Sequence, residues 1–336
     1  MRLISVLLGL CAGVALLVSG CGGGTSASGG GSSGGGKITL AAYSTPKEAY
    51  EAIIPAFQKT AAGQGVSFEQ SYGASGEQSR AVEAGLPASV VAFSLAPDVD
   101  RLVKAGIVSS DWSSDSYHGM VTDSVVVFVV RKGNPKGIHT WADLVKPGIQ
   151  VITPNPFTSG GARWNLMAAY GAQLELGKSE DDALSFLSDV LKHTAVQDKS
   201  ARDALQTFVG GKGDVMLAYE NEAITAQQKG EDVDYVVPDQ TILIENPVAA
   251  TTDGGATAKA FVEYLRTPPA QKIFGEKGYR PVVKSVLDTF QFPQPSGLFT
   301  IDKVGGWDEV LSKFFDRDTG LVAKMEQDLG VSTDSG

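Results

Sequence analysis

Residues 153–165 read Thr-Pro-Asn-Pro-Phe-Thr-Ser-Gly-Gly-Ala-Arg-Trp-Asn and join two segments of different character. The apolar run before them, 149–152, predicts a buried strand, and the run 164–170 predicts a helix. Glycines at 160 and 161 let a ligand approach the main chain where the first helical N–H groups and the positive end of the helix dipole face outward. The segment therefore predicts an oxyanion site, and a plain strand–helix turn capped by Ser159 is the alternative.

The same arrangement recurs elsewhere along the chain. Ser75 lies between a strand-like run and a predicted helix at 78–84, and Ala201 lies at the start of a helix predicted at 202–209. A further helix start at Thr45 has the pattern of a capping box, so the Thr45 hydroxyl is expected to cap that helix.

Strand-like apolar runs alternate with amphipathic runs over most of the chain. Strands are expected at 38–42, 66–68, 90–93, 124–130, 149–152, 195–196, 215–218, 235–237 and 242–244. Helices are expected at 48–61, 78–84, 99–105, 164–172, 180–192, 202–209, 223–229, 256–266, 270–277 and 307–315. This alternation predicts an α/β protein whose parallel sheets carry helices on both faces, with ligands bound beyond the carboxyl ends of the strands.

These motifs resemble the signature of a known family. Asn155-Pro156 followed by residues 159–165 is similar to the signature of the sulfate-binding proteins of bacterial ABC importers. Further matches lie in order at 72–76, 131–135, 141–144, 218–223, 279–281, 298–302 and 305–307. The resemblance covers about residues 38–310, and thiosulfate-binding proteins are close relatives of the same family.

The resemblance implies a two-domain periplasmic-binding-protein fold of type II, with the ligand in the cleft between the domains. The expected division is domain 1 at 37–126 plus 245–310, domain 2 at 127–244, and a last helix and polar tail at 311–336. Two hinge strands are expected where the chain crosses between the domains, near 124–130 and 242–249.

The resemblance also implies which residues surround the anion. Ser75 and Ser159 are expected to give hydroxyl and main-chain donors, and Gly160, Gly161 and Ala201 are expected to give main-chain N–H groups only. Two nearby arginines, 163 and 202, are expected to pair with other side chains or bridge the domains without touching the anion. Exposed helix charges are the alternative for both.

The chain departs from the family at three positions near this site. Tyr219 stands where relatives usually have a tryptophan, so a hydroxyl is expected to replace the indole N–H as a donor to the ligand. Ser44, which the resemblance also places at the ligand, stands where relatives commonly have an aspartate, and the serine lowers the local negative charge. Phe157 replaces a lysine that is often present and removes one charge from the rim.

The chemistry of the ligand decides what the site should offer. Sulfate is a fully ionised dianion at neutral pH, whereas phosphate keeps one proton. A carboxylate that faced sulfate would leave two acceptors in contact and a buried charge unpaired. A sulfate site is therefore expected to present donors only.

The N-terminal region has the features of an export signal. Residues 1–20 combine a positive start with an apolar run, which predicts a signal peptide. Ser-Gly-Cys at its end resembles a lipoprotein processing site, so Cys21 is expected to carry lipid and residues 21–36 to form a Gly/Ser tether. A cleaved signal with an incidental cysteine and a plain membrane anchor are the alternatives.

Composition excludes several function classes. The 336 residues carry a net charge of −10, which argues against a nucleic-acid partner. Both cysteines, Cys11 and Cys21, lie in or beside the signal, so disulfides and cysteine-based metal sites are not expected in the body. The three histidines show no metal-ligand spacing. No metal and no cofactor is therefore predicted.

The sequence and the resemblance together predict a non-enzymatic, monomeric lipoprotein outside the cytoplasmic membrane or in the periplasm. It would capture sulfate and deliver it to the membrane subunits of an ABC permease. Thiosulfate, molybdate and phosphate are alternative ligands. A secreted serine hydrolase with Ser159 as nucleophile is a further alternative, and it requires a histidine beside that serine.

Overall fold

The computed structural model describes residues 35–334, and the predicted signal peptide, Cys21 and most of the predicted tether lie outside this range. Its strands are β1 (Lys37–Tyr43), β2 (Ser67–Gly73), β3 (Val90–Ala92), β4 (Met120–Arg131), β5 (Val151–Pro154), β6 (Thr194–Asp198), β7 (Val215–Tyr219), β8 (Val233–Val236), β9 (Gln240–Ala250), β10 (Arg280–Pro281) and β11 (Gly297–Phe299). The α-helices are α1 (Lys47–Phe57), α2 (Ser75–Glu83), α3 (Ala96–Lys104), α4 (Gly160–Glu175), α5 (Glu180–His193), α6 (Ala201–Val209), α7 (Glu220–Gln228), α8 (Gly255–Leu265), α9 (Pro268–Glu276), α10 (Lys284–Leu287), α11 (Gly306–Phe314) and α12 (Leu321–Asp328). Three short 3₁₀ segments are η1 (Trp141–Val145), η2 (Thr252–Gly254) and η3 (Ile301–Val304).

The strands form a mixed sheet in the order β2-β1-β3-β9-β4-β7-β5-β6. Strand β1 pairs in parallel with β2 and β3, and β5 pairs in parallel with β6 and β7. The expectation of purely parallel sheets is wrong for the middle of the sheet, because β4 and β9 are antiparallel to each other and to β7 and β3, respectively. A chain that leaves one parallel set along β4 and returns along β9 must run these two strands in opposite directions.

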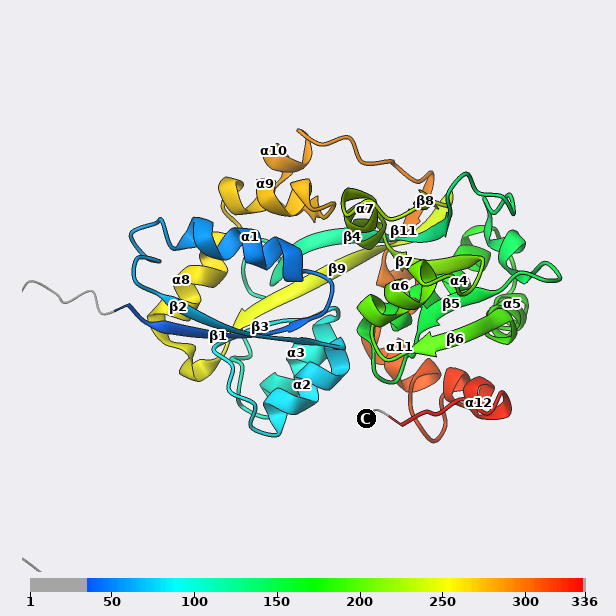
Figure 1. Ribbon diagram of the computed structural model, residues 1–336. Coiled ribbons are helices and arrows are strands. Elements are labelled where there is room, and N and C mark those ends of the chain that lie inside the picture. Colours follow the sequence, from blue (N-terminus) through cyan, green and yellow to red (C-terminus); the bar gives the residue numbers. More distant parts are fainter. Residues whose placement is uncertain (1–34, 335–336) are drawn as a thin grey trace, which may run out of the picture. The chain divides into compact units, whose positions relative to one another are not determined.

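The two middle strands are the longest and reach both parallel sets (Figure 1). Strand β4 pairs with β9 and β10 over its first half and with β7 and β8 over its second half. Strand β9 pairs with β11 at its start and with β3 at its end. Both contain the runs predicted as crossings, and both extend beyond them.

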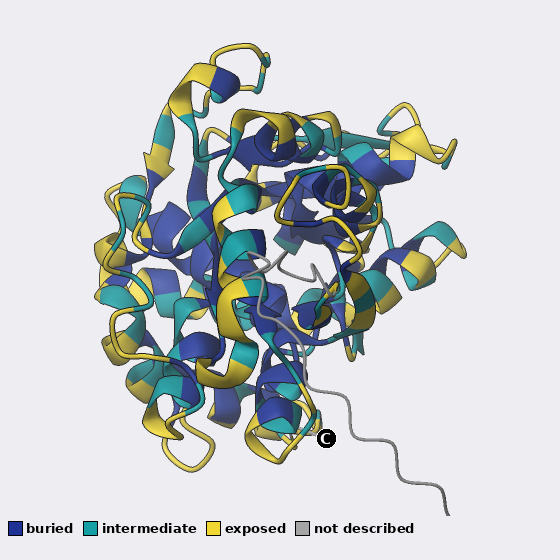
Figure 2. Ribbon diagram, turned by 90° about the vertical axis from the view of Figure 1, so that its left-hand side faces the viewer, coloured by how far each residue is buried: buried dark blue, intermediate teal, exposed yellow. Residues whose placement is uncertain are grey.

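Helices cover both sides of the sheet because each presents an apolar stripe to it. In α1 the stripe is Tyr50, Ile53, Ile54 and Phe57, at the spacing of one helix face, and all four are buried. Helix α4 differs because thirteen of its sixteen residues are buried. It therefore lies inside the core. Figure 2 shows that buried residues gather toward the middle of the described part and that the outer loops are mostly exposed.

Most predicted elements are present with shifted ends. Short elements β10, β11 and α10 had no periodic pattern and were not predicted. The capping box at Thr45 is wrong: α1 begins at Lys47 without a side-chain cap, and the Thr45 hydroxyl lies 2.9 Å from the hydroxyl of Tyr279. Within residues 35–334, no helix combines the length and apolar character needed to span a bilayer.

Candidate functional site

A small cavity of ≈ 10 Å³ lies where several helices begin. Its lining residues are Tyr43, Ser44, Thr45, Ala74, Ser75, Ser94, Ser159, Gly161, Ala201 and Tyr219. Six of the seven predicted ligand-binding residues are among them, and they come from segments far apart in sequence. The volume is below the roughly 300–1,000 Å³ of pockets for drug-sized ligands, so a small ion suits it better than a large organic molecule.

The loop before α4 is organised by Asn155. The Asn155 carbonyl accepts hydrogen bonds from the N–H of Thr158 and of Ser159, and its side-chain oxygen accepts one from the N–H of Phe157. Arg163 closes the same loop by donating from Nε to the carbonyl of Pro156 over 2.8 Å. These bonds direct the first turn of α4 at the cavity.

Side chains one turn further along α4 fix the helix to the strands. Asn165 donates to the hydroxyl of Thr153 in β5 and to the carbonyl of Leu217 in β7. Trp164 donates from its indole to the carbonyl of Ser94, which follows β3. Helix α4 is thus tied to both parallel sets of strands, and its N-terminus has little freedom to move.

The two glycines at this N-terminus have different surroundings. A Cβ at Gly161 would lie 3.5 Å from Ser159 Oγ and 3.5 Å from Tyr219 Cε1, both in the cavity wall. A Cβ at Gly160 would lie 2.9 Å from Ser94 Cβ and from Leu95 Cγ. Gly161 therefore leaves space for a ligand, whereas Gly160 leaves space for the packing of the segment after β3 and does not line the cavity.

Helix N-termini supply unpaired N–H groups at the cavity. Within the described residues, the N–H groups of Ser75, Gly161 and Ala201 have no acceptor, and each lies in the first turn of α2, α4 or α6. Ser200 caps α6 by accepting from the N–H of Asp203, so the capping prediction holds there. Three positive helix ends at one cavity favour an anion.

The two predicted hydroxyl donors are engaged differently from expectation. The N–H of Ser159 donates to Asn155, so the expected main-chain donor at 159 is not available. Ser159 Oγ makes no hydrogen bond to another described residue and lines the cavity. Ser75 Oγ donates to the buried carboxylate of Asp98 over 2.5 Å and accepts from the N–H of Ser94.

Three more hydroxyls in the wall come from Tyr219, Tyr43 and Ser94. Tyr219 Oη lies 2.5 Å from Ser94 Oγ, and either oxygen can be the donor. The buried hydroxyl of Tyr43 has no hydrogen-bond partner among the described residues. Burial raises the pKa of both tyrosines, so both keep their proton at neutral pH. Sequence reasoning missed Ser94 and Tyr43, although Tyr43 ends β1 and Ser94 follows β3, at the edge where ligands were expected.

No ionised side chain lines the cavity in the described part of the chain, and charges gather just outside it. Arg202 makes a bidentate pair with Glu48 at 2.5 and 2.8 Å, and Lys229 pairs with the same carboxylate. Lys199 pairs with Glu77 at 2.7 Å. We call these five residues the paired rim. Arg202 thus contacts other side chains and not the cavity, as predicted.

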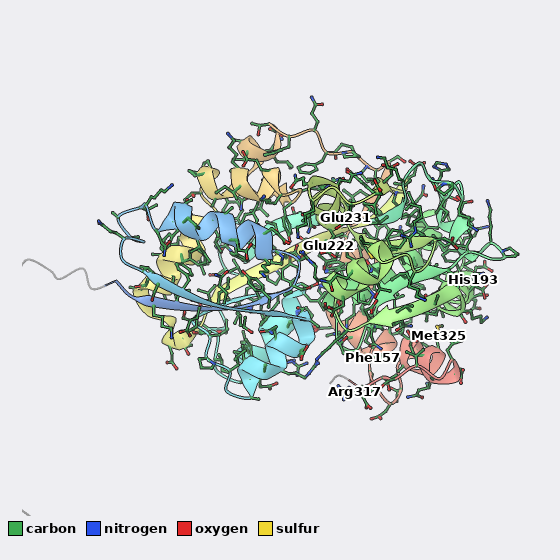
Figure 3. The ribbon with its side chains drawn as sticks, viewed as in Figure 1. Phe157, His193, Glu222, Glu231, Arg317 and Met325 are labelled. Atoms are coloured by element: carbon green, nitrogen blue, oxygen red, sulfur yellow. The ribbon has the colours of Figure 1, made fainter. Side chains whose placement is uncertain are left out.

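The buried acid Glu222, labelled in Figure 3, lies next to Arg202 of the paired rim. Its Oε1 is 3.4 Å from Arg202 Nε, which is a longer and weaker contact than the bidentate pair. Burial raises the pKa of Glu222, whereas Arg202 opposes that shift. Burial also raises the pKa of Glu48, but hydrogen bonds from Arg202 and Lys229 outweigh it and lower that pKa to about 2.

The cavity offers neutral donors and no catalytic pair. None of the three histidines lines it, so the nucleophile–base arrangement required for a Ser159 hydrolase is missing from the lining. The described residues also contain no cluster of three or more His, Cys, Asp or Glu side chains that could hold a metal ion. Such a site can bind a small anion without transforming it.

Comparison with known proteins agrees with this geometry. A family model for "Bacterial extracellular solute-binding protein" matches residues 38–280. The sulfate-binding protein of Synechococcus elongatus is 43% identical over 331 residues, which are 95% of this chain and 94% of that protein. The chain belongs to the sulfate-binding family of bacterial extracellular solute-binding proteins.

Other members of this family support the same assignment. The structure of the sulfate-binding protein SubI from Mycobacterium tuberculosis H37Rv matches with a TM-score of 0.81 and 45% identity, covering 84% of this chain and 100% of that one. The thiosulfate-binding protein of Escherichia coli is 34% identical over 293 residues, 82% of this chain and 87% of that protein. The predicted family and the α/β periplasmic-binding-protein fold are confirmed, and the family is a non-enzymatic component of transport.

Proposed function

We propose that this chain captures sulfate in the cavity and presents it to an ABC permease. One observation carries the proposal: three helix N-termini and several hydroxyls surround a cavity without an ionised side chain. The donors that line the cavity are the N–H groups of Gly161 and Ala201 and the hydroxyls of Ser159 and Tyr219. The sulfate-binding relatives support sulfate as the first ligand to test.

Three other predicted residues, Ser44, Ser75 and Gly160, would contribute less directly to anion binding. Ser44 lines both the cavity and the adjoining groove, so it would contact the anion or the water around it. Ser75 would contribute its N–H, because its hydroxyl is held by Asp98. Gly160 would act by permitting close packing of α4 against residues 94–95.

Ligand capture would close two domains over the cavity. We keep the division at 37–126 plus 245–310 and 127–244 as part of the proposal, with β4 and β9 as the hinge strands. Contacts of Trp164 and Tyr219 with Ser94 join these segments beside the cavity. A closed monomer would then carry the anion to the permease.

The ligand is tested by calorimetry on protein freed of bound ions by unfolding, dialysis and refolding. Sulfate should bind more tightly than thiosulfate, molybdate or phosphate, because each of these is larger or carries a proton. Tighter binding of thiosulfate would assign the chain to the thiosulfate branch. Absence of binding to all four anions would refute the proposed function.

Membrane attachment is proposed through lipid on Cys21, which lies outside the described residues. Cys21→Ser should move the protein from the membrane fraction to the soluble fraction or leave it unprocessed. Cys11→Ser is the matched control and should change neither. Unchanged processing and fractionation of Cys21→Ser would contradict lipid attachment at this residue.

A further inference from the structure

Ser94, in the segment after β3, lines the cavity and is bonded through its N–H, its carbonyl and its hydroxyl. The N–H of Ser94 donates to Ser75 Oγ over 2.9 Å. Its carbonyl accepts from Trp164 Nε1 at 2.9 Å and from Asn246 Nδ2 at 3.2 Å. Residues from α2, α4 and β9 therefore hold the main chain of Ser94 in one place.

The side chain of Ser94 has little space in which to rotate. The residue is only 1% exposed, and a Cβ built at Gly160 would lie 2.9 Å from both the Cβ and the Oγ of Ser94. The first turn of α4 thus packs directly against one side of the serine. On another side, Ser94 Oγ lies 2.5 Å from Tyr219 Oη. Packing therefore fixes the serine hydroxyl against the tyrosine hydroxyl.

The pair of hydroxyls has two hydrogens, and this number limits which bonds it can make. One hydrogen forms the bond between Ser94 Oγ and Tyr219 Oη, and the other is left for a different acceptor. Burial raises the pKa of Tyr219, so the phenol keeps its proton at neutral pH. Because both residues line the cavity, an anion bound there is a suitable acceptor for the second hydrogen.

The direction of this bond follows from the acidity of the two hydroxyls. A phenol ordinarily titrates near pH 10, far below an aliphatic hydroxyl, so it is the stronger donor toward an anion. The tyrosine ring also adjoins the start of α4, since a Cβ at Gly161 would lie 3.5 Å from Tyr219 Cε1. Ser94 then donates to Tyr219, and Tyr219 donates to the anion. Hydrogen bonds arranged in such a chain polarise and strengthen one another.

We propose that Ser94 is a positioning residue for sulfate, an inference that rests on the proposed function. Its hydroxyl holds Tyr219 Oη at the cavity and occupies one acceptor site of that oxygen, which leaves the tyrosine hydrogen for the anion. Ser94 itself makes no bond with the anion. Its contribution to affinity therefore disappears when residue 219 has no hydroxyl.

The test is a double-mutant cycle of Ser94→Ala and Tyr219→Phe, with sulfate affinity measured by calorimetry for all four proteins. Ser94→Ala alone should weaken binding about three- to tenfold, as for one lost hydrogen bond. In the Tyr219→Phe background the same substitution should change affinity less than about twofold, so the double variant should bind about as weakly as Tyr219→Phe. A purely structural effect of Ser94→Ala would instead be similar in both backgrounds.

Ser89→Ala is the matched control at the other end of β3. Ser89 Oγ accepts from the N–H of Thr39 at 2.9 Å, so this alanine also removes a hydrogen bond. Ser89 does not line the cavity, and five residues of extended chain span about 16 Å. The control should lower the melting temperature and leave sulfate affinity unchanged. Melting curves on all variants check that each remains folded.

The possible contrary results separate this inference from the proposed function. Equal losses from Ser94→Ala in the tyrosine and phenylalanine backgrounds would show that Ser94 does not act through Tyr219. Unchanged affinity in Ser94→Ala would remove its role in binding altogether. Both results would leave sulfate binding by the wild type intact. Failure of the wild type to bind sulfate would refute the proposed function and, with it, the role of Ser94.

Discussion

The wall of the cavity and the paired rim beside it use opposite means to hold charge. The wall contains hydroxyls and main-chain N–H groups of Gly161 and Ala201, whereas the rim joins Glu48 to Arg202 by a bidentate ion pair. Fixed dipoles stabilise a buried anion without placing a second ion in the low-dielectric interior. The difference suggests that neutral groups select the ligand and that ion pairs stabilise the surrounding structure. Variants in each region should separate these two effects.

The largest effect is expected from Gly161→Ala. Its methyl group would enter the cavity 3.5 Å from Ser159 Oγ, so it should displace the anion without a clash in the empty protein. Sulfate affinity should fall at least about thirtyfold, or about 2 kcal/mol, as for a lost bond to a charged group. Calorimetry measures the loss, and an unchanged melting temperature shows that the fold remains intact.

Gly160→Ala is the matched control for that variant. Its methyl would meet Ser94 and Leu95 at 2.9 Å, so this change should lower the melting temperature. If Gly161→Ala bound sulfate as well as the wild type, the N-terminus of α4 would not be the binding surface.

Tyr219→Phe should have the next largest effect. It removes the hydroxyl that lies 2.5 Å from Ser94 Oγ and leaves the ring in place. We expect about a tenfold loss of sulfate affinity, or about 1.5 kcal/mol, because one donor is lost and Ser94 loses a partner. Titration calorimetry decides this, and equal affinity would show that the ring serves packing alone.

Glu48→Gln tests the paired rim and should act less on binding than on pH dependence. Removing the charge should change sulfate affinity less than about threefold, since Glu48 does not line the cavity. The main effect should be a loss of fold stability of about 1–3 kcal/mol, because Arg202 loses a bidentate partner. The pKa of Glu48 is lowered from 4.5 to about 2 in the folded protein. The pair therefore stabilises the fold fully above pH 4.5, and that stability is lost as pH falls toward 2.

Thermal melting between about pH 5 and about pH 2 measures this contribution. The wild type should lose more stability over this window than Glu48→Gln, which has no carboxylate to titrate at this position. Parallel loss in both proteins would show that the pair does not stabilise the folded state.

The smallest effect is expected at the outer edge of the paired rim. Lys199 and Glu77 are 54% and 36% exposed, and exposed pairs contribute about 0–1 kcal/mol. Lys199→Ala should therefore change sulfate affinity less than about twofold at about 0.15 M salt. A tenfold loss would show that this lysine contributes to sulfate binding. It would contradict the view that the cavity wall binds the anion and that the paired rim only stabilises the fold.

The sequence predicted the parts of the site that depend on local pattern. The Ser-Gly-Gly turn before α4 and the start of α6 were visible because strand, small residues and helix follow one another in sequence. Gly161 and Ala201 were assigned through family resemblance, and the structure brings both to the same cavity. The alternation of elements likewise predicted the α/β class.

The features that sequence missed depend on contacts across the fold. Thr45 has a capping pattern, yet its hydroxyl forms a hydrogen bond with the hydroxyl of Tyr279, which lies 234 positions away in the chain. The directions of β4 and β9 follow from how the chain returns between the two parallel sets, and an apolar run contains no information about direction. The carboxylate of Asp98 accepts a hydrogen bond from the hydroxyl of Ser75, and no local sequence motif indicates this contact.

The most direct test of a neutral-donor cavity is calorimetry with sulfate and with phosphate at several pH values on both sides of neutrality. Sulfate remains a dianion throughout, so its dissociation constant should change by less than about threefold. Phosphate keeps a proton for which the wall offers no carboxylate as acceptor, so it should bind at least about thirtyfold more weakly, or about 2 kcal/mol. Comparable binding of the two anions, or a steep pH dependence for sulfate, would contradict the account of the cavity.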